Sequence, residues 1–128
     1  MHDALIIGGG PAGLSAALAL GRTRRTAVIF DSGEYRNAMS AHAHTIPTHD
    51  HEDPAVIRGE MAAELQEKYK TVEFSNVAAG LIREVDGIFE LVDAKGKLWK
   101  GRKVVLAVGS RDILLDIPGY KESWGKSM

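Results

Sequence analysis

Residues 4–31, ALIIGGGPAGLSAALALGRTRRTAVIFD, decide the fold of this chain. They contain an apolar run, a glycine-rich turn, a helix-like run of small residues and a second apolar run that ends on an acid. This order is typical of a βαβ unit, in which two parallel strands are joined by a helix. The stretch therefore predicts an α/β fold with a Rossmann-like parallel sheet.

Three glycines in the turn follow the G-x-G-x-x-G spacing, and each is expected to have its own task. Gly8 allows a tight turn after the strand, Gly10 leaves no Cβ to obstruct a pyrophosphate, and Gly13 permits close helix packing. Pro11 suits the first helical turn, where its missing N–H costs nothing, and Ala12 follows it. The free N–H groups and the positive end of the helix dipole predict an anion-binding site.

Asp31 ends the second apolar run at about the distance where a dinucleotide site needs an acceptor for a ribose hydroxyl. Arg36 and Asn37 follow in a polar turn, where they either contact the nucleotide or its pyrophosphate or make ordinary loop hydrogen bonds. The stretch has two interpretations. It is a dinucleotide-binding site, or it is a βαβ unit whose glycines only turn the chain.

Length and charge limit the class of protein. The 128 residues suffice for a single domain, and a net charge of −1 gives no electrostatic case for binding nucleic acid or an anionic membrane. No apolar run approaches the length of a membrane-spanning helix. Because the chain starts almost directly on a strand, we expect no signal segment and a soluble, cytoplasmic protein.

The chain has no cysteine, which excludes disulfides, thiolate zinc sites and dithiol chemistry within it. Its 42–51 segment holds four histidines interleaved with acids, but their spacing matches no closed metal site, so no metal site is predicted. A loop that lies over a cofactor is the favoured interpretation. The histidines of this segment are His42, His44, His49 and His51.

The rest of the chain predicts one further helix and several strands. The first helix is expected to end at about Gly21, and Asp53 and Pro54 are expected to open a second one that runs to about residue 70. Its buried stripe is expected to contain Ile57, Met61 and Leu65. A short strand at 72–74 follows.

Turn signals at Asp86-Gly87 and Lys95-Gly96 separate three short runs between residues 81 and 99, which predicts an antiparallel meander. The apolar run at 103–108, which ends at Gly109, is expected to form a separate, buried parallel strand.

These motifs together resemble the FAD domain of the low-molecular-weight thioredoxin reductase family. DALIIGGGPAG, VVLAVGSRD and IPGY carry the likeness to the family as a whole. FDSGEYRN, HAHTIPTHDHEDP and DIPGYKESWGKS look like its fungal branch, which includes dithiol oxidases of epipolythiodioxopiperazine biosynthesis. The resemblance implies a Rossmann-like FAD-binding domain with a small antiparallel meander, in an oxidoreductase that acts on disulfides or dithiols.

The resemblance also implies roles for particular residues. The glycine turn and the first helical turn would cradle the FAD pyrophosphate, the acid would hold the adenosine ribose, and the polar turn would continue the cleft. Val108 stands where the family usually has a threonine, in a segment that passes close to the flavin. The implied cofactor-binding residues are Gly8, Gly10, Pro11, Ala12, Gly13, Asp31, Ser32, Arg36, Asn37 and Gly109.

In the family, WGK is followed by a nicotinamide domain with a C-x-x-C pair, and the chain then returns to finish the FAD domain. The sequence contains neither part, so the resemblance implies a fold incomplete at its C-terminus and no catalytic residue in this chain. NADPH would serve only if the missing domain were supplied, and a homodimer or a partner that carries this domain could cover exposed apolar surface. The alternatives are a non-catalytic nucleotide-binding or interaction module and a small NAD-binding dehydrogenase.

Overall fold

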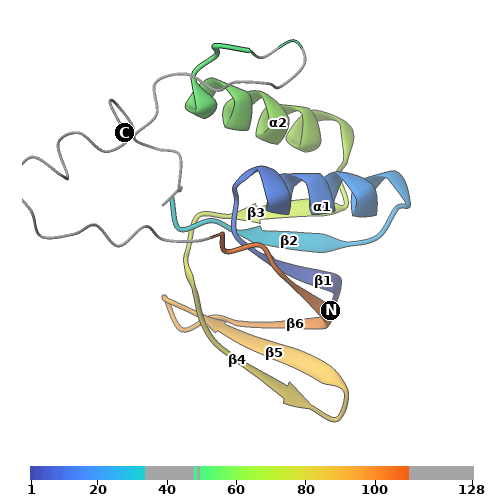
Figure 1. Ribbon diagram of the computed structural model, residues 1–128. Coiled ribbons are helices and arrows are strands. Elements are labelled where there is room, and N and C mark those ends of the chain that lie inside the picture. Colours follow the sequence, from blue (N-terminus) through green and yellow to red (C-terminus); the bar gives the residue numbers. More distant parts are fainter. Residues whose placement is uncertain (34–47, 49, 110–128) are drawn as a thin grey trace, which may run out of the picture.

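A computed structural model describes residues 1–33, 48 and 50–109, which form one mixed sheet with helices packed on it (Figure 1). The polar turn with Arg36 and Asn37, the histidines His42, His44 and His49, and the DIPGYKESWGKS ending lie outside the described residues. The elements are β1 (His2–Ile7), α1 (Pro11–Arg22), β2 (Ala27–Phe30), α2 (Pro54–Lys68), β3 (Val72–Ser75), β4 (Ala79–Val85), β5 (Ile88–Asp93) and β6 (Leu98–Leu106).

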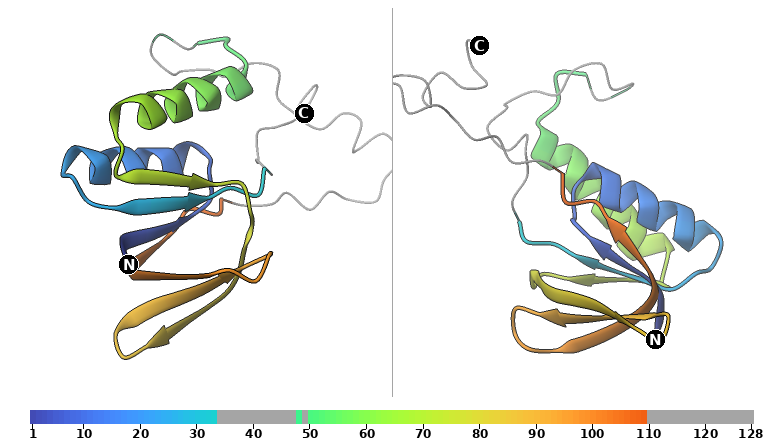
Figure 2. Two further views of the ribbon diagram at one scale, coloured as in Figure 1. Left: turned by 180° about the vertical axis from the view of Figure 1, so that it is seen from behind. Right: turned by 60° about the horizontal axis from the view of Figure 1, so that its bottom comes forward.

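The order of the strands, β3-β2-β1-β6-β5-β4, confirms the predicted Rossmann-like α/β fold. β1 lies between β2 and β6 and pairs with both in parallel, and β2 pairs in parallel with β3. β5 pairs antiparallel with both β4 and β6, which is the predicted meander. The helices α1 and α2 cover the parallel strands, and the meander bends away from them (Figure 1; Figure 2).

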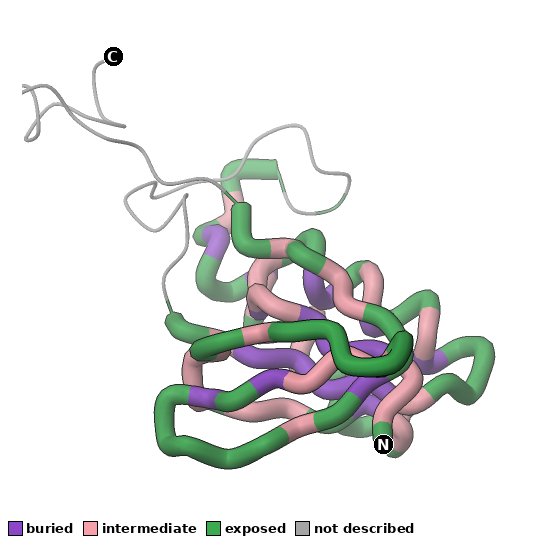
Figure 3. Tube along the Cα trace, turned by 90° about the horizontal axis from the view of Figure 1, so that it is seen from below, coloured by how far each residue is buried: buried purple, intermediate pink, exposed green. Residues whose placement is uncertain are grey.

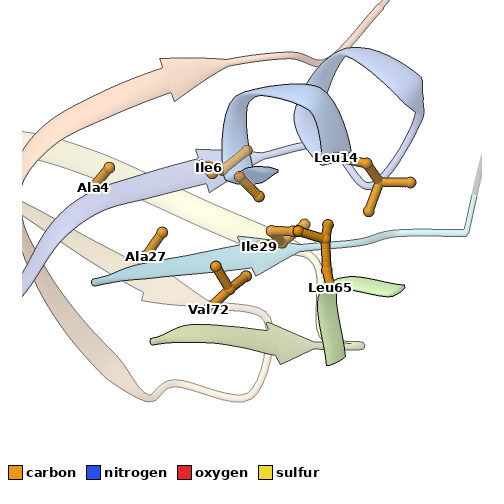
Figure 4. Close-up of a cluster of buried hydrophobic side chains, with 8 residues drawn as sticks. Ala4, Ile6, Leu14, Ala27, Ile29, Leu65 and Val72 are labelled. Atoms are coloured by element: carbon orange, nitrogen blue, oxygen red, sulfur yellow. The ribbon is translucent and has the colours of Figure 1, made fainter. Parts of the chain in front are cut away.

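The main buried cluster lies between the helices and the parallel strands (Figure 4). Side chains alternate between the two faces of a strand, so every second residue of β1 and β2 points to it. Small residues on the strands allow the helices to approach closely. The cluster consists of Ala4, Ile6, Leu14, Ala17, Ala27, Ile29, Leu65 and Val72.

The helix α1 runs one residue beyond the predicted end and has its C-cap at Thr23. The end of the helix thus agrees with the prediction to within one residue, and Gly21 is buried in its last turn. A Cβ on Gly21 would lie 3.0 Å from the Tyr69 ring, just after α2. This glycine is needed for the contact between the two helices and not for a cap.

The helix α2 begins as predicted and ends at Lys68. Asp53 caps it, because its Oδ1 accepts a hydrogen bond from the Ala55 N–H at 2.8 Å. Ile57 and Leu65 are buried, and Met61 packs against the main cluster, so the predicted stripe is confirmed. Among the helices of the described residues, none is long and apolar enough to cross a membrane.

The third strand of the meander and the predicted parallel strand are one continuous strand, β6, which corrects the prediction of two. Gly101 lies where β6 changes partners, because it pairs with Phe89 of β5 on one side and with His2 of β1 on the other. A Cβ on Gly101 would lie 2.6 Å from Leu5 Cγ. The glycine therefore permits the close packing at which the meander joins the parallel strands.

A second buried cluster lies on the face of the sheet away from the helices and contains Leu5, Val28, Phe30 and Leu91. The meander covers this face, and Trp99 of β6 meets Phe30 edge-on at 5.3 Å between ring centroids. Buried residues follow the central strands, while the hairpin turns of the meander are exposed (Figure 3).

The apolar run at 103–108 is parallel to β1 as predicted, but it is less buried than predicted. Val105 packs against the helix-side cluster and Val104 against the opposite one. Leu106 and Val108 are 71% and 65% exposed, because neither cluster of the described residues reaches them.

Asp93 organises the turn between β5 and β6. Its side chain is buried, its Oδ1 accepts hydrogen bonds from the N–H groups of Lys95 and Lys97, and its Oδ2 accepts one from Trp99 Nε1 at 3.0 Å. The Trp99 hydrogen bond, followed by the two N–H groups and the Lys97 charge, lowers the pKa of Asp93 below its ordinary 3.8. The carboxylate is thus held in its charged form.

The lowered pKa predicts how stability depends on pH. The unfolded chain binds this proton more readily, so the Asp93 contribution is complete above pH 3.8 and is lost as the pH falls through that value toward the lower folded pKa. Asp93→Asn is expected to be less stable than the parent at neutral pH and to lose less stability on acidification. Denaturation midpoints measured from pH 7 to pH 3 would test this, with the exposed Asp86→Asn as control; an unchanged acid profile in Asp93→Asn would contradict it.

Candidate functional site

The glycine turn lies where three parallel strands end together. The Gly8 N–H donates to the Phe30 carbonyl of β2 at 2.9 Å, and the Ala107 N–H, just after β6, donates to the Ile7 carbonyl at 2.8 Å. Gly8 has a φ of +116°, and a Cβ at this position would overlap the Ala107 carbonyl. Only glycine fits both the conformation and the space, so the predicted tight turn is confirmed.

The start of α1 rests on this turn. A Cβ on Gly13 would overlap the Gly8 carbonyl, and it would lie 3.4 Å from Ile6 Cγ2. The predicted role of Gly13 in close packing is therefore confirmed. The contact fixes the first turn of the helix against the carboxyl end of β1.

Gly10 is the N-cap of α1, and its carbonyl accepts the first helical hydrogen bond from the Leu14 N–H at 3.0 Å. No side-chain cap forms at this end among the described residues, and Pro11 and Ala12 are exposed. The N–H groups of the first turn have no partner within a helix. Together with the helix dipole they can hold an anionic group.

Asp31 follows β2 directly and lies beside the glycine turn. Its N–H donates to the Ser75 carbonyl at 3.0 Å, and its Oδ1 accepts a hydrogen bond from the Gly33 N–H at 2.9 Å. A Cβ on Gly9 would overlap the Asp31 carboxyl group, so the buried Gly9 is what lets the acid approach the turn. Sequence reasoning missed Gly9, although three successive glycines where the spacing requires only two were a signal.

A groove of about 360 Å³ opens beside Asp31, between α2 and the carboxyl ends of the parallel strands. The α2 side is built largely from small residues, and the opposite side comes from the glycine turn and the end of β3. Sequence reasoning assigned none of the α2 residues to a site, although a glycine inside a helix (Gly59) was a signal. The lining residues are Gly9, Leu14, Asp31, Ala55, Arg58, Gly59, Ala62, Gln66, Phe74 and Asn76.

The remaining predicted site residues divide into two groups. Ser32 is exposed next to Asp31. Gly109 is exposed, has a φ of +69° and follows β6, whose carboxyl end lies at the same edge of the sheet as the glycine turn. Arg36 and Asn37 lie outside the described residues. In residues 1–33, 48 and 50–109, no three His, Asp or Glu side chains gather as a metal site.

A family model described as "Pyridine nucleotide-disulphide oxidoreductase" matches residues 2–128. Among curated proteins, "Thioredoxin reductase sirT" of Leptosphaeria maculans is 48% identical over 98% of this chain and 39% of the relative. "Thioredoxin reductase aclD" of Aspergillus oryzae is 49% identical over 100% of this chain and 41% of the relative. The predicted resemblance to fungal thioredoxin reductases is thus confirmed, and the chain spans about 40% of the length of these relatives.

Solved structures of other proteins contain the same fold as this chain. An oxidoreductase from Agrobacterium tumefaciens superposes with a TM-score of 0.92 at 34% identity, over 98% of this chain and 42% of the other. A thioredoxin reductase TrxB described as putative, from Bacillus anthracis, has a TM-score of 0.91 at 31% identity, over 97% of this chain and 42% of the other.

Proposed function

Because this chain belongs to the pyridine nucleotide-disulphide oxidoreductase family, we propose that residues 1–128 form an FAD-binding domain of a thioredoxin-reductase-like flavoprotein. The observation that carries the proposal is the open N-terminus of α1 beside Asp31, at the edge where β1, β2 and β6 end. This edge is where open α/β sheets bind dinucleotides.

The described residues fit an adenine dinucleotide. The first-turn N–H groups of α1 are donors for a pyrophosphate, and Gly10 has no side chain over them. The half-buried Asp31 offers an acceptor for a ribose hydroxyl. Ser32 and Gly109 follow strands that end at this same edge of the sheet, and the family resemblance implies that Arg36 and Asn37 would continue the cleft. When bound, FAD would supply two-electron chemistry between a nicotinamide and a disulfide or dithiol.

Removal of the Asp31 carboxylate tests the ribose assignment. A hydrogen bond to a charged group contributes about 1.5–3 kcal/mol, so Asp31→Ala is expected to weaken FAD binding by roughly 10-fold to 100-fold. Calorimetric titration of the chain with FAD measures the change. Glu84→Ala, which removes an exposed acid from the meander, is the matched control and is expected to keep the parent affinity.

NAD is the second candidate ligand, and Asp31 is the observation that favours it. A carboxylate at this position accepts hydrogen bonds from an unmodified ribose and repels a 2′-phosphate. Titrations with FAD, NADH and NADPH would separate the two functions. Tight FAD binding with weak NADH binding supports the flavoprotein, whereas the reverse order supports a small NAD-binding dehydrogenase.

We expect this chain by itself to show no NADPH-dependent disulfide reduction. The reaction needs a thiolate to attack the disulfide and form a mixed disulfide, and the chain has no cysteine. Thiol release from an aromatic disulfide can be followed by absorbance with FAD and NADPH present. Turnover that scales with the concentration of pure chain would contradict this expectation.

A further inference from the structure

We propose that the free edge of β6, residues 102–106, pairs antiparallel with the same edge of a second copy of this chain. This pairing concerns assembly and does not depend on FAD. β1 pairs with β6 as far as Leu106, whereas β5 pairs with β6 only as far as Gly101. Within residues 1–33, 48 and 50–109, the segment 102–106 therefore has a strand on one side only.

The backbone of this edge offers hydrogen-bonding groups at alternate residues. The Ala107 N–H donates to the Ile7 carbonyl of β1, and the N–H and C=O groups of successive strand residues point to opposite sides. Val105 therefore also faces β1, whereas the N–H and C=O groups of Val104 and Leu106 point away from it. Such outward-facing groups on a strand edge are a template for pairing with another chain.

Both buried clusters of the sheet end at this edge. Val105 packs against the helix-side cluster and Val104 against the opposite one, yet both are only half-buried. Their partners in β1, Ile6 and Leu5, are fully buried. Leu106 is 71% exposed. A strand laid along this edge would remove apolar surface from water on both faces of the sheet, which favours association.

The charges along the edge favour a second copy in antiparallel orientation. Arg102 and Lys103 lie at the beginning of the edge, and the exposed Leu106 and Val108 lie at its end and just beyond it. In an antiparallel pair the two charged beginnings are far apart, and each meets an apolar end. A parallel pair would place like charges side by side, which is destabilising. The edge is thus complementary to itself, as the interface of a twofold dimer must be.

The neighbouring strand β5 selects the register. A twofold axis beside Val104 would carry residue 107 of the second copy to Gly101, where β5 already pairs. An axis beside Val105 avoids this overlap and places Val104 of one copy opposite Leu106 of the other. Both side chains lie on the face of the second buried cluster, because alternate strand residues share a face. The exposed Leu106 would thus be covered by Val104 of the second copy.

Sedimentation velocity without FAD tests the dimer. The parent chain is expected to sediment as a dimer in the micromolar concentration range. Leu106→Lys is expected to weaken dimerisation at least roughly 10-fold, because it brings a charge into the apolar contact, and to keep the circular dichroism spectrum of the parent. Leu81→Lys is the matched control, because Leu81 is 70% exposed on β4, and it is expected to dimerise as the parent does.

Val105→Cys tests the register, because the chain has no cysteine of its own. Residues opposite each other in a non-hydrogen-bonded antiparallel pair have Cα atoms about 4.5 Å apart, within the range of about 4.4–6.8 Å that a disulfide spans. Air oxidation is expected to convert most of this variant into covalent dimers, and the exposed control Leu81→Cys far less.

Three results would each overturn the proposal. The first is a parent chain that stays monomeric throughout the micromolar range. The second is a Leu106→Lys variant that dimerises as tightly as the parent. The third is a Val105→Cys variant that cross-links no faster than Leu81→Cys.

Discussion

Gly8→Ala is expected to destabilise the chain by about 2–5 kcal/mol. An alanine at a φ of +116° is strained by about 1–2 kcal/mol, and its Cβ would also overlap the Ala107 carbonyl. Overpacking of this kind costs typically about 1–3 kcal/mol, and the backbone on both sides is fixed by hydrogen bonds between strands. Since domains are stable by only about 5–15 kcal/mol, much of the margin would be lost. Urea denaturation followed by circular dichroism measures the change.

Gly96→Ala separates the two contributions to this loss. Gly96 has a φ of +84° in the exposed turn after β5, and a Cβ there would meet no atom within 4 Å. Gly96→Ala should therefore reduce the free energy of unfolding only by the backbone strain, which is about 1–2 kcal/mol. If Gly8→Ala and Gly96→Ala lose the same free energy of unfolding, the close approach of the Ala107 carbonyl is not what requires glycine at position 8.

Gly10→Val is expected to abolish most FAD binding while the fold persists. The N-cap has a φ of −81° and an extended ψ, which any residue adopts, so the backbone tolerates the change. A branched side chain at this position would stand over the N–H groups that the pyrophosphate needs. Loss of two charge-assisted hydrogen bonds, at about 1.5–3 kcal/mol each, corresponds to a roughly 100-fold or greater decrease in affinity. Calorimetric titration with FAD measures it.

Ser15→Val is the control for this prediction. Ser15 is exposed on the next turn of α1, where it is outside the N-terminal group of N–H donors. It is expected to bind FAD with the parent affinity. Parent-like affinity in Gly10→Val as well would place the pyrophosphate elsewhere and would overturn the assignment of the glycine turn.

Much of the parallel half could be predicted from sequence because its determinants are local. Strand, glycine turn, helix and acid follow one another within residues 4–31, and the Asp53 cap and the i, i+4 spacing from Ile57 to Leu65 define α2 within one segment. Such signals depend on neighbouring residues only, and the structure confirms them. The structural roles of Gly8 and Gly13 can also be predicted from this local glycine spacing.

Other features could not be predicted because they depend on residues far apart in the sequence. The single strand β6 depends on the pairing of Gly101 with both His2 and Phe89, which no local pattern indicates. Gly21 matched the usual pattern of a helix end, yet its role depends on Tyr69, which follows the second helix. The groove is lined by the glycine turn, α2 and the end of β3, which are far apart in the sequence, so no local pattern predicts it.

Binding of FAD at the glycine turn can be tested without any activity assay. The most direct test is to saturate the purified chain with FAD, remove free ligand by gel filtration, and record the visible spectrum of the protein peak. Oxidised flavin is expected to elute with the chain at a ratio near one to one and to be absent from the Gly10→Val peak. A folded, colourless parent chain, with all flavin eluting free, would show that this chain does not bind FAD at the glycine turn.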